Sequence, residues 1–143
     1  MNVKFAATTS EIFSSLLILV WVYAAFSKLM DFEKFKLVLT SSPLIGRFAD
    51  TIAIGLPFLE LSIATLLFVP KYRLWGFRAS LVLMSVLTAY LAYMIAFVPH
   101  LPCACGGILE KLSWREHLVF NICLTIMASI GFLIYKRSKF LLQ

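Results

Sequence analysis

Two cysteines separated by one residue, Cys103 and Cys105, are the clearest candidates for chemistry in this sequence. They lie in the segment PHLPCACGG, in which Gly106 and Gly107 follow the pair directly. Residues i and i+2 reach the Cα separation of a disulfide, about 4.4–6.8 Å, only if the chain bends, so a bridge here is strained and easily reduced. The glycines permit positive φ and the close approach of another protein's backbone. These are the requirements of a disulfide that exchanges.

Basic and imidazole side chains flank the cysteine pair in the sequence. Lys111 and Arg115 lie near the expected start of the next helix, where they would stabilise a thiolate. His100 and His117 are the candidate acceptors for the proton of an attacking thiol. Together with the two cysteines, these histidines form the predicted catalytic set.

Two other interpretations of the cysteine segment stay open. His100, Cys103, Cys105 and His117 offer the nitrogen and sulfur ligands of a soft or borderline metal. However, their spacing, H-x2-C-x-C-x11-H, matches no strong metal-binding pattern, so no metal site is predicted. Alternatively, the cysteines pack in a turn or form a static bridge.

The composition of the chain is that of a polytopic membrane protein. Of its 143 residues, 62% are hydrophobic and 14% are charged, and the mean hydropathy is +0.94. Apolar runs predict transmembrane helices at about 12–30, 51–69, 74–98 and 114–135, which leaves no residues for an aqueous domain. We therefore expect an all-α, single-domain bundle of four transmembrane helices. The first span is expected to be retained, because Glu11 interrupts a signal-like start and no A-x-A site follows.

The connection between the first two spans has a helical pattern of its own. Phe32, Phe35, Val38 and Leu39 fall at i, i+3, i+6 and i+7, and charged residues fill other positions. This pattern predicts a short amphipathic helix in the membrane interface, with Pro43 ending it or starting the turn.

Polar residues inside the spans are the candidates for contacts to a bound cofactor. Glu60 lies within the second span, where a bare carboxylate costs a few kcal/mol, so it should face the bundle and be protonated or hydrogen-bonded. Tyr93 lies near the end of the third span, where core packing or an aromatic belt is the alternative interpretation. Lys28 is expected to extend its ammonium to the headgroups. Asp50 or Thr51 is the expected N-cap of the second span.

The start of the fourth span combines a capping signal with a polar stripe. Ser113 and Glu116 have the spacing of a capping box. His117, Asn121 and Thr125 recur every four residues and so share one face, on which Asn121 is a third candidate for cofactor contacts. Cys123, about 200° around the helix from Asn121, should face away as a small apolar residue.

The placement of charge predicts an orientation rather than a nucleic-acid partner. The net charge is +6, but the basic residues lie at helix ends and no basic stripe interleaves with aromatic residues. Clusters of basic residues at the N-terminus, in the turn from Lys71 to Arg78 and at the C-terminus predict that both termini are cytoplasmic. In a bacterium the chain would then lie in the inner membrane, with the cysteine segment on the oxidising periplasmic side.

Several segments resemble the MauE family (methylamine-utilisation protein E) of DoxX-like membrane proteins. They are CACGG, the run LSWREHLVFN that opens the last span, FSKLMDFEKFKLVLTSSPLIG after the first span, and the glutamate of the second span, here Glu60. The resemblance implies a four-helix membrane bundle associated with thiol–disulfide chemistry outside the cytoplasm. It also implies a thioredoxin-like partner and a role in the maturation of a disulfide-rich periplasmic enzyme subunit.

The resulting hypothesis is an integral membrane thiol–disulfide protein. Electrons would pass between the Cys103–Cys105 pair and either an extracytoplasmic thioredoxin-fold protein or a membrane quinone, which is the candidate cofactor. The alternative is a non-enzymatic membrane subunit or assembly factor of a larger complex, in which the bridge is structural. A third hypothesis is metal handling.

Overall fold

The computed structural model describes residues 3–98 and 113–141. In this part of the chain the regular elements are α1 (Val3–Met30), α2 (Phe32–Thr40), the 3-10 helix η1 (Gly46–Phe48), α3 (Ala49–Phe68), α4 (Arg73–Phe97) and α5 (Trp114–Leu141). The four long helices α1, α3, α4 and α5 are apolar and long enough to cross a membrane. The predicted all-helical, four-span architecture is therefore confirmed.

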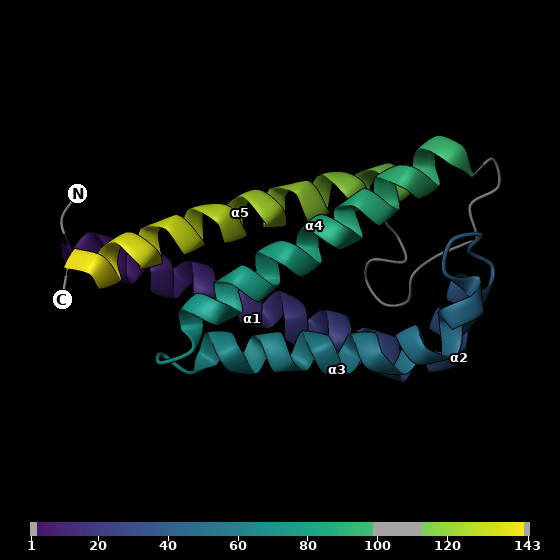
Figure 1. The fold of residues 1–143 in the computed structure, drawn as a ribbon, viewed down its shortest axis with the longest axis horizontal. Helices are drawn as coiled ribbons and strands as arrows, with labels where there is room; N and C mark the ends of the chain where they lie inside the picture. Colours follow the sequence, from purple (N-terminus) through teal and green to yellow (C-terminus); the bar gives the residue numbers. More distant parts are fainter. Residues whose placement is uncertain (1–2, 99–112, 142–143) are drawn as a thin grey trace.

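The four long helices form an antiparallel ring (Figure 1). Helix α1 packs against α3 and α5, and α4 packs against the same two neighbours. The two termini lie at one end of the bundle, together with the turn between α3 and α4. Helix α2, the end of α4 and the start of α5 lie at the opposite end, which we call the α2 end. The segment 99–112, with both loop cysteines, joins α4 to α5 and is thus attached at the α2 end.

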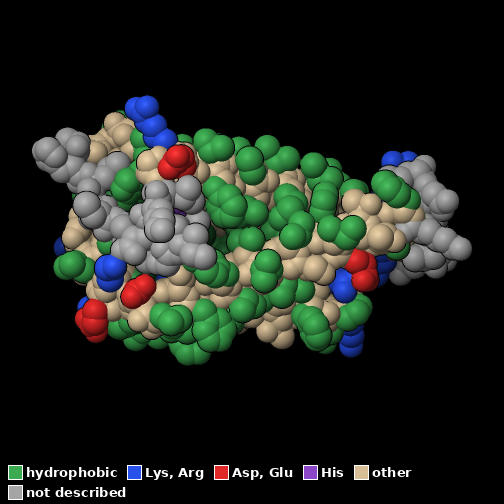
Figure 2. Space-filling view, turned by 180° about the vertical axis from the view of Figure 1, so that it is seen from behind, with side chains coloured by type: hydrophobic (Ala, Val, Ile, Leu, Met, Phe, Trp, Pro, Cys, Tyr) green, Lys and Arg blue, Asp and Glu red, His purple; other side chains and the backbone are tan. Residues whose placement is uncertain are grey.

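The surface is that of a membrane-embedded bundle. Figure 2 shows hydrophobic side chains over the middle of one face and charged side chains near its two ends. Helix α1 has 28 residues, about 42 Å at 1.5 Å per residue, and so exceeds a hydrocarbon layer of about 30 Å. Helices α1 and α5 extend beyond the predicted boundaries at 12 and 135, because backbone hydrogen bonding continues after hydropathy falls.

Small residues let the helices approach closely around the core. Trp21 on α1 is buried and donates its indole N–H to Ser80 Oγ on α4 at 2.9 Å. A Cβ at Gly76 would lie 2.7 Å from the Leu67 amide nitrogen, and one at Gly131 would lie 2.6 Å from the Phe77 ring. The remaining core is aliphatic: its buried members include Leu17, Ile63, Leu67, Met84, Leu124 and Ala128.

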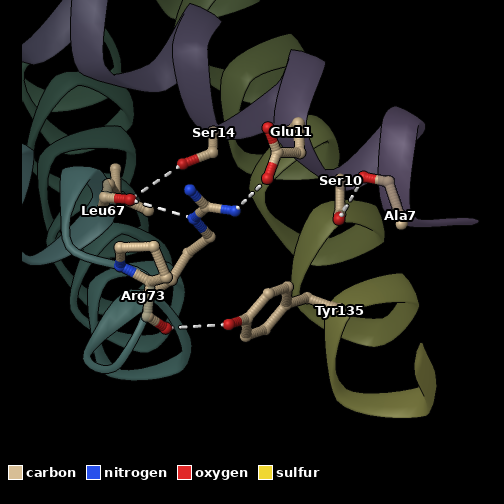
Figure 3. A network of polar contacts seen from close by, with 8 residues as sticks. Ala7, Ser10, Glu11, Ser14, Leu67, Arg73 and Tyr135 are labelled. Atoms are coloured by element: carbon tan, nitrogen blue, oxygen red, sulfur yellow. Dashed lines mark hydrogen bonds and ion pairs between the residues drawn. The ribbon is translucent and has the colours of Figure 1, made fainter. Parts of the chain in front are cut away.

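A polar network fastens the turn between α3 and α4 to the neighbouring helices (Figure 3). The Leu67 carbonyl near the end of α3 accepts hydrogen bonds from Ser14 Oγ and Arg73 Nε, both at 3.1 Å. Arg73 also pairs with Glu11 at 2.8 Å, and the Tyr135 hydroxyl donates to the Pro70 carbonyl at 2.9 Å. Side chains from α1, α4 and α5 thereby satisfy carbonyls that have no partner within α3.

Helix α2 confirms the predicted short amphipathic element. Its buried residues are Phe35, Val38 and Leu39, and Phe35 and Leu39 pack with Ala49 and Ala53 of α3. The apolar face of α2 therefore rests on the bundle.

The predicted N-cap of the second span, Asp50 or Thr51, is wrong, because Phe48 occupies that position. Helix α3 begins at Ala49, so Asp50 lies in its first turn rather than at the N-cap. The Asp50 carboxylate instead pairs with Lys36 of α2 at 2.6 Å. An acidic residue in the first turn also interacts favourably with the positive end of the helix dipole.

Candidate functional site: a buried ion pair at the α2 end

A lysine and a glutamate from different spans form a buried ion pair. Lys28, in the last turn of α1, places its Nζ 2.8 Å from Glu60 Oε1 on α3. The exposed fraction is 22% for the Lys28 side chain and 1% for that of Glu60. The prediction that Glu60 faces the bundle and is hydrogen-bonded is confirmed. The expectation that Lys28 reaches the headgroups is wrong, because a buried carboxylate attracts its ammonium inward.

The pair leaves one strong acceptor position unused. Lys28 Nζ donates to Glu60 Oε1 and also lies 3.2 Å from the Ala24 carbonyl. Glu60 Oε2 is buried and has no hydrogen-bond partner within the described part of the chain. A buried acceptor without a partner costs about 1–3 kcal/mol, more when charged, so such an atom in a native site calls for an explanation. Oε2 can accept a proton or a hydrogen bond.

Helix α2 shields this pair from one side. The ring of Phe35 lies with its centroid 5.8 Å from Lys28 Nζ, within the range of a cation–π interaction. Just after α2, Ser42 is buried with its hydroxyl 3.8 Å from the Met94 sulfur of α4. The amphipathic connection between the first two spans therefore packs against the α2 end of the bundle, with Phe35 beside the Lys28 ammonium.

The start of α5 places a histidine at the α2 end. Ser113 and Glu116 form the predicted capping box: the Ser113 N–H donates to Glu116 Oε2 at 2.7 Å, and the Glu116 N–H lies 3.3 Å from Ser113 Oγ. One residue later, His117 lies in the first turn of α5. A defined helix start thus fixes the position of His117 at the α2 end.

The predicted polar stripe on α5 turns toward the bundle. Asn121 is buried and donates to the His117 carbonyl at 3.1 Å. Thr125 donates to the Asn121 carbonyl at 2.8 Å and lies 3.4 Å from the hydroxyl of Thr88 on α4. These hydrogen bonds satisfy polar groups that would otherwise be costly within the membrane. Cys123 is exposed, which confirms that it faces away from the stripe.

The remaining predicted site residues are not part of this ion-pair site as the structure describes it. Tyr93 is 38% exposed, and its ring centroid lies 5.0 Å from that of Phe97, on the outer side of α4. His100, Cys103 and Cys105 lie outside the described residues. Among the described residues, no group of three or more His, Cys, Asp or Glu side chains is placed to hold a metal ion.

The site contains a cation that sequence reasoning did not assign to it. Lys28 lies near the end of its helix, whereas Glu60 lies near the middle of α3, so their positions along the spans gave no reason to pair them. A lysine in the first span opposite an acidic residue in the next span was the available signal. Such a pair can hold a proton or exchange one with a group that reaches Oε2.

Comparisons with known proteins give a single family assignment. No curated protein and no solved structure gives a significant match to this chain. The family model described as methylamine utilisation protein MauE matches residues 6–134, a range that includes all four transmembrane helices in whole or in large part. This four-helix membrane protein therefore belongs to the MauE family of methylamine utilisation proteins.

Proposed function

We propose that this chain is an integral membrane thiol–disulfide protein whose redox pair is Cys103 and Cys105. One cysteine thiolate attacks a disulfide of an extracytoplasmic thioredoxin-fold partner, which forms a mixed disulfide and releases the partner's second sulfur as a thiolate. The other cysteine, also as a thiolate, then attacks the loop sulfur of the mixed disulfide, which closes the Cys103–Cys105 disulfide and releases the partner's first sulfur as a thiolate. Two electrons pass from the pair to the partner, and the reverse sequence passes them back. A membrane quinone, reduced to a quinol by two electrons and two protons, is the other candidate partner.

The observation that carries the proposal is the position of the charged groups. Lys28, which pairs with Glu60, lies in the last turn of α1, and His117 lies in the first turn of α5. Both of these turns are at the α2 end, where the segment with the two cysteines joins α4 to α5. A thiol must lose its proton before it attacks, and nearby cations and imidazoles assist that loss. Charged groups kept within a membrane bundle indicate function, because their desolvation is costly.

The proposed orientation places both termini in the cytoplasm and the α2 end outside the inner membrane. Within residues 3–98 and 113–141, more of the basic residues outside the ion pairs of Lys28, Lys36 and Arg73 lie at the end with the termini than at the α2 end, which is the distribution of cytoplasmic ends. Those at the end with the termini include Lys71, Arg78, Lys136, Arg137 and Lys139.

A membrane-impermeant maleimide tests the orientation in intact cells that make a Cys123→Ser variant. We expect Cys103 and Cys105 to react once they are reduced. In a variant that lacks all three of the native cysteines, the new cysteine of Arg137→Cys should react with the maleimide only after the membrane is opened. The reverse pattern would contradict the orientation.

The redox state of the cysteines tests the function. In the Cys123→Ser background, the purified chain is alkylated before and after mild reduction, and its mass is measured. We expect both cysteines to gain a label only after mild reduction, and the labelled fraction to follow the thiol–disulfide ratio of the buffer. A bridge that resists mild reduction would instead support the alternative, a membrane subunit or assembly factor with a structural disulfide.

A further inference from the structure

Two cations from neighbouring helices meet at one aromatic ring near the end with the termini. Arg78 of α4 places its Cζ 5.6 Å from the centroid of the Phe132 ring on α5. Lys136 of α5 places its Nζ 6.0 Å from the same centroid. Arg78 also lies 5.1 Å from the centroid of Trp75. The cluster of Trp75, Arg78, Phe132 and Lys136 thus spans the α4–α5 seam and is called the seam cluster.

The positive charge of the seam cluster has no acidic counterpart in the described residues. In the described part of the chain, the ion pairs join Lys28 to Glu60, Lys36 to Asp50 and Arg73 to Glu11. Arg78 and Lys136 take part in none of them, and both side chains are exposed. Two like charges held beside one ring repel each other, so an anion between or beside them would lower the free energy of the site.

The surroundings of the seam cluster are apolar and face outward. Trp75 is 61% exposed, and farther into the membrane Val82 and Leu133 are exposed on the same two helices. Arg78 and Val82 are four residues apart and so lie on one face of α4. Cations at the rim of such a surface, beside an exposed tryptophan, match the phosphate and acyl parts of a lipid.

We propose that the seam cluster binds the headgroup phosphate of an anionic phospholipid. Arg78 and Lys136 contact the phosphate, Trp75 lies at the level of the headgroup, and the acyl chains run along the α4–α5 seam. A zwitterionic lipid fits less well, because its own ammonium group meets two cations. The site lies at the opposite end from the Lys28–Glu60 pair and is independent of the proposed redox function.

Native mass spectrometry of the full chain tests this site. The protein is released from micelles that contain equal amounts of phosphatidylglycerol and phosphatidylcholine, and the retained lipid is counted. We expect phosphatidylglycerol to be retained preferentially. Arg78→Gln and Lys136→Gln should each lower that preference about fivefold, the effect of one basic residue near anionic lipid. Lys139→Gln, which removes an equal charge from the same end of α5, should change it little.

Each contrary result overturns the proposal. An equal loss in Lys139→Gln would mean diffuse attraction by net charge. Release of the lipid by millimolar inorganic phosphate would mean a general anion site. Should Arg78→Gln fail to fold, as judged by its helical circular dichroism, Arg78→Lys takes its place. Arg78→Lys keeps the charge and should keep the preference, and its loss would contradict a charge-based site.

Discussion

The Lys28 ammonium lies 2.8 Å from Glu60 Oε1 and ties the end of α1 to the middle of α3. If the ion pair is broken, the two side chains differ in whether their charge can reach water or the lipid headgroups. Lys28 is 22% exposed and near a helix end, so its long stem can carry the charge to the headgroups. Glu60 is 1% exposed and has no such route. The pair is therefore asymmetric.

This asymmetry predicts unequal effects of removing either partner. Lys28→Met strands a buried carboxylate and should destabilise the bundle by up to about 3–5 kcal/mol, the range for a broken buried pair. Glu60→Gln keeps the shape and an acceptor for Lys28, so it should cost clearly less and leave the protein folded. Unfolding midpoints in mixed micelles would measure both. The double variant Lys28→Met/Glu60→Gln should be more stable than Lys28→Met alone, and equal losses in the two single variants would contradict the asymmetry.

The four spans were predictable because hydropathy over about 20 residues reflects the cost of placing polar groups in lipid. The capping box at Ser113 and Glu116 and the inward stripe through Asn121 were also predictable, since both depend on local helical spacing. The partner of Glu60 was not predictable from the sequence, because Lys28 could equally have reached the headgroups. Only the packing of α1 against α3 decides between the two positions.

The network at the other end of the bundle predicts a second unequal comparison. Glu11 is 65% exposed, so its pair with Arg73 is screened by water, and Glu11→Gln should cost less than about 1 kcal/mol. Arg73 is 12% exposed, donates to the Leu67 carbonyl and lies 5.8 Å from the Tyr135 ring. Arg73→Gln should therefore cost about 1–3 kcal/mol. Thermal unfolding of the two variants under identical conditions would compare them, and a larger loss in Glu11→Gln would contradict this ranking.

The Lys36–Asp50 pair between α2 and α3 predicts a dependence on alkaline pH. The hydrogen bond to Asp50, and then its negative charge, raises the pKa of Lys36 above its ordinary value of 10.5. A raised pKa means that the pair stabilises the fold fully below pH 10.5 and that this contribution is lost as the pH rises through the folded-state pKa. The wild type should thus exceed Lys36→Gln in stability at pH 8, and the difference should vanish above the folded-state pKa.

A matched variant isolates this effect from general alkaline unfolding. Asp50→Asn removes the acceptor charge, so adding Lys36→Gln to it should cause little further change at either pH. Chemical unfolding of these four proteins at pH 8 and at pH 11 would provide the eight free energies of unfolding that the comparison needs. If the difference in stability between the wild type and Lys36→Gln grew as the pH rose, the result would contradict this prediction.

The last prediction concerns the order in which the two loop cysteines act. Pro102 directly precedes Cys103 and stiffens its backbone, whereas Cys105 precedes two glycines and lies closer to the start of α5. Cys105 is therefore expected to form the mixed disulfide, and Cys103 to resolve it. In the Cys123→Ser background, Cys103→Ser should accumulate a reducible adduct with an extracytoplasmic thioredoxin-like protein, visible on non-reducing gels, and Cys105→Ser should not. The opposite pattern would reverse the order of attack. If neither variant traps a partner and the variant with both cysteines replaced restores full function in cells lacking the protein, the redox proposal fails and the membrane-subunit alternative replaces it.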